Sequence, residues 1–199
     1  ESESRNAHFR WRMPAGDGER VPWHDMASHG SFVLLAGGLG PRYAGGDDSF
    51  LHGYASDDYL SLTVLGGRNP MCDGPFSRRA VMTHWLLHGL CAELARGDFL
   101  AHEFAGDDIH RQIVRFSNGS AAVNRGATDW QVEGHTLPSY GFVAKAGPVT
   151  ASIARRDGLI TAFATGPGHL FADARPPAGA DPVLAGWVAT LAGHTNDAQ

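Results

Sequence analysis

The residues from 116 to 175 constrain the fold most, because short apolar-alternating segments recur there between turn signals. Asn118-Gly119 and Asp157-Gly158 favour tight hairpins, since Asn, Asp and Gly tolerate positive φ. Strand-like segments in and just before this region are 112–116, 130–132, 141–144, 149–153 and 159–163. Strands at such regular spacing predict a small antiparallel β-sandwich.

The first half of the chain follows a different pattern, with one strong helix and glycine-rich loops. Ser77 is a suitable N-cap for a helix over residues 78–96, and Gly97 is placed as its C-cap. From Phe99 onward the apolar period changes to two, so the domain boundary is placed near Gly97-Asp98. The apolar residues that define the helix at three- and four-residue spacing are Val81, Met82, Trp85, Leu86, Leu90 and Leu94.

Shorter elements flank this helix. Acidic residues at the start and glycines at the end predict a short helix over 57–65. Residues 21–25 and 68–72 are each typical of a short strand that opens into a loop, and the apolar run 31–36 fits a strand or a short buried helix. A last helix is expected from Asp181-Pro182 to about residue 192.

Composition limits the classes of protein. The 199 residues are 43% hydrophobic and 19% charged, which is ordinary for a globular chain of one large or two small domains. A net charge of −5 argues against a nucleic-acid partner, and neither a membrane span nor a signal peptide is recognisable. Cys72 and Cys91 either pair or are buried thiols. Glu1-Ser2-Glu3-Ser4 is typical of a linker or a cut point, and the compartment stays undetermined.

The first candidate site is the segment around His24-Asp25. Trp23 precedes it and His29 follows it closely. A carboxylate at the end of a buried strand, beside an aromatic ring and a histidine, can act as acid, base or nucleophile, or can bind sugar hydroxyls. The alternative is that Asp25 caps loop amides and that His24 is a partly buried polar residue.

Two further polar clusters lie in glycine-rich loops. Asp57 and Asp58 are near His52 and Tyr54, and paired carboxylates there can bind substrate or metal, or can act as N-terminal helix charges. A second group surrounds the Pro70-Met71 turn and can face a pocket at a strand end. The members of this second group are Arg68, Asn69 and Asp73.

His84 and His88 are four residues apart and therefore share one face of the predicted helix. That spacing can hold zinc, but Trp85 stands where a metalloprotease has glutamate, and no third ligand is recognisable. The alternative is two surface or packing histidines. No metal and no cofactor is predicted, and neither a phosphate loop nor a Gly-x-Ser-x-Gly elbow is present.

Aromatic residues of the second half can stack on sugars or form the core. These residues are Trp130, Tyr140, Phe142 and Phe163. At strand positions the core is the simpler interpretation. Asn118, Asn124 and Arg125 are interpreted as turn and edge residues.

Four segments of the second half resemble the C-terminal β-sandwich of barrel-type glycoside hydrolases. They read Phe-Ser-Asn-Gly at 116–119, Val-Asn-Arg-Gly at 123–126, Trp-Gln-Val-Glu-Gly at 130–134 and Leu-Pro-Ser-Tyr-Gly-Phe at 137–142. In that family a short sandwich packs beside the catalytic (β/α)8 barrel. The parts similar to the last strands and helices of such a barrel are 21–25 and 57–95, with 68–72 as the final strand and 78–96 as the final helix.

The resemblance implies an α+β chain in three parts. Residues 1–97 would be the end of a partial (β/α)8 barrel, 98–176 a small antiparallel β-sandwich, and 177–199 a linker with a short C-terminal helix. A complete barrel has eight strands in about 250 residues, so only its last two strand–helix units fit here. The expected partners are a carbohydrate substrate and the missing N-terminal barrel region of the same protein, without nucleic acid or membrane.

The same resemblance implies the C-terminal portion of a glycosidase-like hydrolase of carbohydrate metabolism, not active alone, that forms part of a sugar-binding cleft. Asp25 is then the expected catalytic carboxylate, and the family's acid/base residue has no counterpart. The alternative is a non-catalytic carbohydrate-binding or structural β-sandwich module, which needs exposed aromatic residues on its sheet. The expected substrate-binding residues are Trp23, His24, His29, Tyr54, Asp57, Asp58, Arg68 and Asp73.

Overall fold

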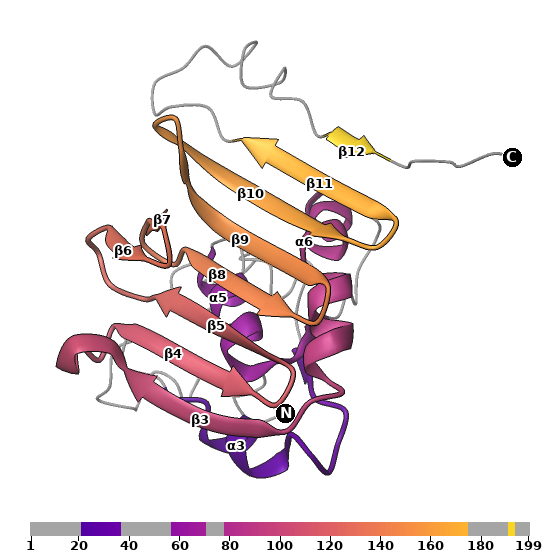
Figure 1. The fold of residues 1–199 in the computed structure, drawn as a ribbon, viewed down its shortest axis with the longest axis vertical. Coiled ribbons are helices and arrows are strands. Elements are labelled where there is room, and N and C mark those ends of the chain that lie inside the picture. Colours follow the sequence, from indigo (N-terminus) through magenta and orange to yellow (C-terminus); the bar gives the residue numbers. More distant parts are fainter. Residues whose placement is uncertain (1–20, 37–56, 71–77, 175–190, 194–199) are drawn as a thin grey trace, which may run out of the picture.

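The computed structural model describes residues 21–36, 57–70, 78–174 and 191–193 (Figure 1). The helical elements are α3 (Trp23–Ser28), α5 (Asp57–Gly66), α6 (Arg78–Leu94) and the 3-10 turn η2 (Ala105–Asp107). The strands of the first half are β1 (Leu35–Ala36) and β2 (Asn69–Pro70). The later strands are β3 (Phe99–Phe104), β4 (Arg111–Phe116), β5 (Gly119–Asn124), β6 (Trp130–Val132), β7 (His135–Leu137), β8 (Phe142–Ala146), β9 (Val149–Arg156), β10 (Leu159–Gly166), β11 (His169–Ala174) and β12 (Leu191–Gly193).

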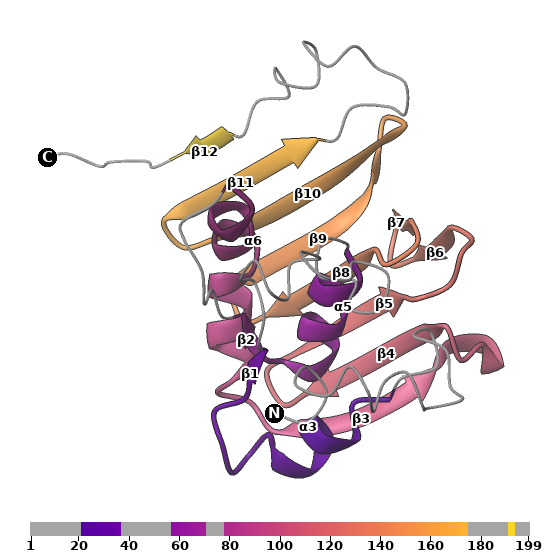
Figure 2. The same ribbon diagram turned by 180° about the vertical axis from the view of Figure 1, so that it is seen from behind.

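The later strands form one antiparallel sheet in the order β12-β11-β10-β9-β8-β5-β4-β3. The short β6–β7 hairpin joins this sheet where β7 pairs with β9. Helices α5 and α6 cover one face of the sheet, as the two opposite views show (Figures 1 and 2). The predicted α+β class with an antiparallel sheet is confirmed, but the described strands from β3 onward form a single sheet with helices on it, not two stacked sheets.

The core lies between the two helices and the sheet. Its helix side consists of large apolar residues, and the facing strands contribute many alanines, including Ala144, Ala151, Ala162 and Ala164. Because these alanines are small, α6 can pack closely across β8, β9 and β10. Large side chains with essentially no exposed surface are Val64, Leu65, Leu87, Leu90, Leu94, Val114, Phe142, Ile153 and Phe171. Burying each of them stabilises the fold by roughly 1.5–3 kcal/mol.

The sequence predicted five of the ten strands in this sheet. Each of the five strand-like segments coincides with a strand, namely β4, β6, β8, β9 and β10. The helices predicted over 57–65 and 78–96 are α5 and α6. One continuous hydrophobic cluster contains residues from both helices and from the sheet. Residues before and after the expected boundary near Gly97-Asp98 therefore share this core.

The two dipeptides that signalled hairpins behave differently. Asp157 and Gly158 both have positive φ, of 50° and 80°, as the favoured two-residue turn requires. At the other hairpin, β4 ends at Phe116 and Gly119 is already the first residue of β5. A Cβ at Gly119 would overlap the carbonyl oxygen of Lys145, so glycine there permits the close approach of β5 and β8.

Two expectations about secondary structure are wrong. Residues 21–25 are not a strand, because α3 begins at Trp23, and the Met26 amide donates to the Pro22 carbonyl. The run is too short for its periodicity to distinguish a helix from a strand. Residues 191 and 192 belong to β12, because the free edge of β11 pairs with them. The rest of that expected helix and the linker before it lie outside the described residues.

β1 and β2 form a separate, parallel pair, with Leu35 opposite Asn69 and Ala36 opposite Pro70. The Asn69 amide also donates to the Leu34 carbonyl at 2.9 Å. Helix α5 lies between these strands in the chain and α6 follows β2, so the order is strand, helix, strand, helix. The described residues contain only this one parallel pair, which does not itself make a barrel end.

Replacing Leu90 by alanine tests the core between helix and sheet. Leu90 is fully buried, so Leu90→Ala is expected to lower the free energy of unfolding by about 2–5 kcal/mol. Leu170→Ala is the matched control, because Leu170 is 45% exposed and its truncation is expected to cost about 0.5 kcal/mol. Urea unfolding followed by circular dichroism measures both variants; equal losses would contradict this core.

Candidate functional site

Three of the residues predicted to bind substrate or catalyse come together where α3 meets the end of α5. Asp25 lies in α3, His29 follows that helix, and Arg68 lies between α5 and β2. The Arg68 guanidinium donates to the Asp25 carboxylate twice, from Nε to Oδ1 at 2.5 Å and from Nη2 to Oδ2 at 2.8 Å. Such a bidentate arrangement fixes the orientation of both side chains.

Two glycines at the end of α5 make room for this group. A Cβ at Gly66 would lie 2.8 Å from the Asp25 Cγ, and one at Gly67 would lie 2.7 Å from the His29 Nε2. Gly67 also has a φ of +63°, which favours glycine after a helix. The Gly66-Gly67 pair therefore ends α5 and also lets α3 approach it closely.

His29 connects α3 to the edge of the large sheet. Its ring centroid lies 5.0 Å from that of Phe116 and 6.1 Å from that of Phe99. The side chain is buried, and its Nδ1 has no hydrogen-bond partner. A buried polar atom without a partner is unfavourable by about 1–3 kcal/mol.

The geometry gives Asp25 a role that the sequence did not suggest. Its carboxylate is 1% exposed, and both of its oxygens accept hydrogen bonds from Arg68. A buried and paired carboxylate holds two segments together, here across 43 residues of sequence. The catalytic role of Asp25 stays a prediction.

The other predicted site residues do not join this group. Trp23 is 71% exposed and His24 is exposed as well, although both lie in α3 beside Asp25. Asn69 is half-buried in β2. The predicted site residues that lie outside the described part of the chain, wholly or in their side chains, are His52, Tyr54, Asp57, Asp58 and Asp73.

The structure adds a third histidine to the pair predicted on α6. His84 and His88 stack with their ring centroids 4.4 Å apart, and the His169 ring of β11 lies 5.0 Å from that of His88. Burial, followed by the charge of His88, lowers the pKa of both His84 and His169. No group of three His, Cys, Asp or Glu residues in the described ranges is placed to hold a metal ion.

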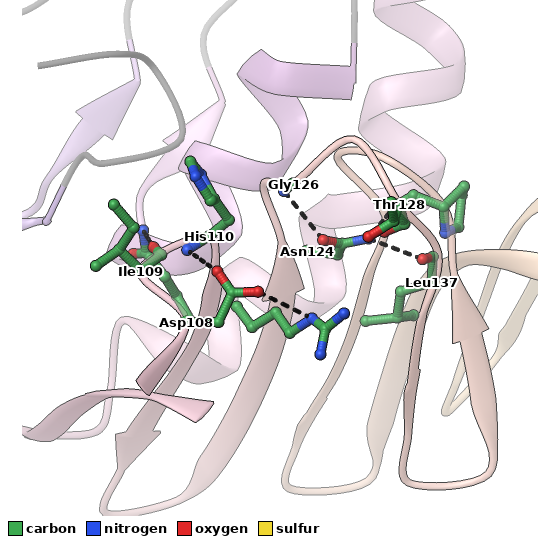
Figure 3. Close-up of polar contacts among 10 residues, drawn as sticks. Asp108, Ile109, His110, Asn124, Gly126, Thr128 and Leu137 are labelled. Carbon is green, nitrogen blue, oxygen red and sulfur yellow. Dashed lines mark hydrogen bonds and ion pairs between the residues drawn. The ribbon is translucent and has the colours of Figure 1, made fainter. Parts of the chain in front are cut away.

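Asn124 organises the loop that carries much of the family-like sequence (Figure 3). It is fully buried, its Nδ2 donates to the carbonyl oxygens of Thr128 at 2.8 Å and Leu137 at 2.9 Å, and its Oδ1 accepts from the Gly126 amide. A third acceptor within reach of Nδ2 is the Pro138 carbonyl at 3.1 Å. The interpretation of Asn124 as an edge residue is therefore wrong.

Arg125, the next residue, connects the same loop to α5. Its Nη1 donates to the Ser61 hydroxyl at 2.9 Å, and its guanidinium lies 5.5 Å from the centre of the Tyr140 ring. The Arg125 amide donates to the His110 carbonyl, and the Asp108 carboxylate accepts from the His110 amide (Figure 3). The Val-Asn-Arg-Gly segment at 123–126 therefore has a structural role, because its side chains connect the loop after β5 to α5 and to β7.

The aromatic residues of the sheet divide into two kinds. Phe142 and Trp130 are buried, as expected of core residues. Tyr140 and Phe163 are half-buried, and each has an arginine above its ring; Arg156 lies 4.5 Å from the Phe163 centroid. An arginine in that position occupies the ring face on which a sugar would stack.

Comparisons with known proteins give no relative for this chain: no protein-family model, no curated protein and no solved structure matches it significantly. None of the helices in the described ranges has the length and apolar character needed to cross a membrane. Cys91 is a free, buried thiol, and burial raises its pKa to about 12. Cys72 lies outside the described residues.

Removing the charge of Asp25 tests its anchoring role. Asp25→Asn keeps the shape but weakens the pairing of the buried Arg68, so we expect the free energy of unfolding to fall by about 3 kcal/mol. Asp98→Asn, at an exposed aspartate, is expected to change it by about 0.5 kcal/mol or less. Urea unfolding at pH 7 measures both; equal stability of Asp25→Asn and the unaltered chain would contradict the anchor.

Asn124→Asp tests the loop network. The substitution removes the Nδ2 donor and adds a buried negative charge beside backbone carbonyl oxygens. We expect a loss of at least about 2 kcal/mol in the free energy of unfolding. Asp129→Asn is the control, because Asp129 is exposed and pairs with the exposed Arg155. An Asn124→Asp protein with the same free energy of unfolding as the unaltered chain would contradict this network.

Proposed function

We propose that this chain is the C-terminal portion of a carbohydrate-active, glycosidase-like hydrolase. In this proposal β1, α5, β2 and α6 are the last strand–helix units of a (β/α) barrel, and the antiparallel sheet is an accessory domain packed on its helices. The likeness of segments 116–142 to such accessory domains supports it. The exposed apolar surface beside β1 is the observation that carries it.

The parallel pair supports the barrel part of the proposal. Parallel neighbours need a crossover connection, and α5 lies between β1 and β2 in the chain. Parallel strands occur almost only in sheets covered on both faces, and a pair with two residues in each strand is too small to be stable by itself. Such a pair is therefore expected to belong to a larger parallel sheet.

The exposed apolar surface, here called the apolar strip, consists of Trp23, Phe32, Val33 and Leu35. These side chains are 71%, 71%, 74% and 50% exposed, respectively, and all lie in or between α3 and β1. Large apolar side chains gathered on one short segment are uncommon on a free surface. Neighbouring barrel strands would cover this strip and would pair with the edge of β1.

The two helices contact both parts of the chain. Helix α6 contacts β2 and also β8, β9 and β10, while α5 contacts β4, β5 and β8. In a β/α barrel the helices form the outer ring around the strands. An accessory sheet that packs on two of those helices therefore fits the proposed arrangement.

The proposed chemistry belongs at the carboxyl ends of the parallel strands. Because β1 and β2 are parallel, the chain leaves both strands at the same end, where barrel enzymes place their active sites. The segments that follow contain Tyr54, Asp57, Asp58 and Asp73, which we assign to substrate binding. Glycosidases use two carboxylates, and the rest of the barrel would supply the acid/base residue.

Asp25 enters the proposal mainly as the anchor of α3. Its ion pair with Arg68 is buried and adjoins the start of β2, so it would hold α3 against the last barrel strand. A catalytic role for Asp25 would require this ion pair to open toward the substrate. Trp23 and His24, which are exposed, are better placed to contact a ligand or the missing strands.

The alternative, a non-catalytic carbohydrate-binding or structural module, lacks a specific supporting observation. A sugar-binding sheet needs exposed aromatic faces, and on the described strands the most exposed aromatic side chain is Phe104, at 37%. Phe104 lies at the end of the edge strand β3.

The experiment that tests the proposed function compares this chain with the longer polypeptide that the proposal expects its gene to encode. We expect the longer polypeptide to hydrolyse glycosidic bonds in a panel of aryl glycosides and oligosaccharides, and residues 1–199 alone to be inactive. An upstream region without a repeated strand–helix pattern, or a folded longer polypeptide without hydrolase activity, would overturn the proposal.

A further inference from the structure

Three histidines, here called the histidine cluster, lie where α6 meets the β10–β11 hairpin. His84 and His88 come from α6, and His169 is the first residue of β11. The His88 Nδ1 is 2.8 Å from the His84 carbonyl oxygen, so it donates there and the ring is fixed on the helix. The centroid of the His88 ring lies 4.4 Å from that of His84 and 5.0 Å from that of His169.

His169 occupies a slot formed by two glycines. A Cβ at Gly89 of α6 would lie 3.0 Å from the His169 Cε1, and one at Gly166 of β10 would lie 2.9 Å from it. The imidazole thus fits between the helix and the hairpin only because both positions lack a side chain. Its Nε2 is buried and has no hydrogen-bond partner, whereas a hydrogen bond with the Pro167 backbone favours the charged ring and partly offsets the effect of burial on the His169 pKa.

Among the described residues, no carboxylate is found to offset the positive charge that the histidine cluster would gain on protonation. The charges that shift the pKa of His84 are those of His88 and His169, and the charge that shifts the pKa of His169 is that of His88. The faces of β9, β10 and β11 toward α6 consist mainly of apolar residues such as Val149, Ala164 and Phe171.

Two acidic residues on the packed elements lie away from the cluster. Glu93 of α6 pairs with Arg96 and contacts Gly147. Asp173 is four residues along β11 from His169, or about 13 Å, and makes contacts of its own. Neither residue contributes to the pKa shifts of His84 or His169.

We infer that the histidine cluster is an acid-sensitive clasp, which holds the β10–β11 hairpin against α6 while it is neutral and loosens it when it is protonated. Positive imidazolium rings with centroids about 4–5 Å apart repel each other; His84 is exposed and His88 and His169 are half-buried, so solvent screens part of this repulsion. The hairpin lies near the sheet end, with β12 beyond it. Opening there exposes Phe171 without unfolding the centre of the sheet.

The direction of the pH effect follows from the lowered pKa values. In an opened hairpin His169 leaves α6 and regains an ordinary pKa near 6.5, whereas in the closed state its pKa is lower. The open state therefore binds more protons below pH 6.5. The clasp has its full stability above that pH and loses it as the pH falls toward the closed-state pKa.

Hydrogen exchange of the β11 amides at pH 7.5 and pH 5.5, corrected for intrinsic rates, tests the clasp. Between these two pH values we expect protection to fall by up to about tenfold, the limit that one histidine with an open-state pKa near 6.5 sets, and by less when the closed-state pKa of His169 lies only slightly below 6.5. NMR titration of the histidine ring protons supplies that pKa in the same sample. A His169 pKa at or above 6.5, or β11 protection that does not change with pH, would overturn the inference.

The variant His88→Gln separates the clasp from simple packing. Glutamine keeps a donor for the His84 carbonyl but removes the titrating ring, so the pKa values of both His84 and His169 should rise toward 6.5 and the pH dependence of β11 protection should shrink. His135→Gln, in β7, is the control and should leave both unchanged.

Two outcomes of the same experiment count against the clasp. A His88→Gln protein that keeps the full pH dependence would overturn it. So would added Zn²⁺ that protects β11 in the unaltered chain but not in His88→Gln, because the cluster would then act as a metal site.

Discussion

The packing of α5 and α6 on one face of the antiparallel sheet is the interaction on which the rest of this structure depends. The helices contribute Leu65, Leu87 and Leu90, and the strands beneath contribute mainly alanine and valine. Helix α5 ends at the Gly66-Gly67 pair that receives Asp25 and His29, and α6 carries two residues of the histidine cluster. Both groups of functional interest are therefore placed by the same apolar contact.

Much of the fold could be predicted from the sequence because its signals are local. The strands around Asp157-Gly158 follow from turn chemistry and alternation, and α6 follows from its apolar period. The segments that were mispredicted depend on distant partners. Residues 191–193 become a strand only because β11 has a free edge, and α3 packs against β3 and is tied to Arg68, far along the chain.

The candidate site was predictable in its members but not in its arrangement. Asp25, His29 and Arg68 were singled out by residue type and are indeed neighbours, but no sequence pattern indicates that the carboxylate is buried at 1% exposure against the guanidinium. His169 could not be joined to His84 and His88, because their proximity arises only where the start of β11 meets α6 in the folded chain. Likewise, the sequence places Asn124 among turn and edge residues, whereas its amide is buried among loop carbonyls.

The central claim is that β1 is an interior strand of a larger parallel sheet and that the apolar strip is its contact surface. Hydrogen exchange of the amides from Val33 to Ala36 tests this most directly, in residues 1–199 and in the longer polypeptide that the proposal expects. The account predicts rapid exchange in the shorter chain and strong protection in the longer one, because a neighbouring strand then accepts those hydrogen bonds. Equal and rapid exchange in both would contradict it.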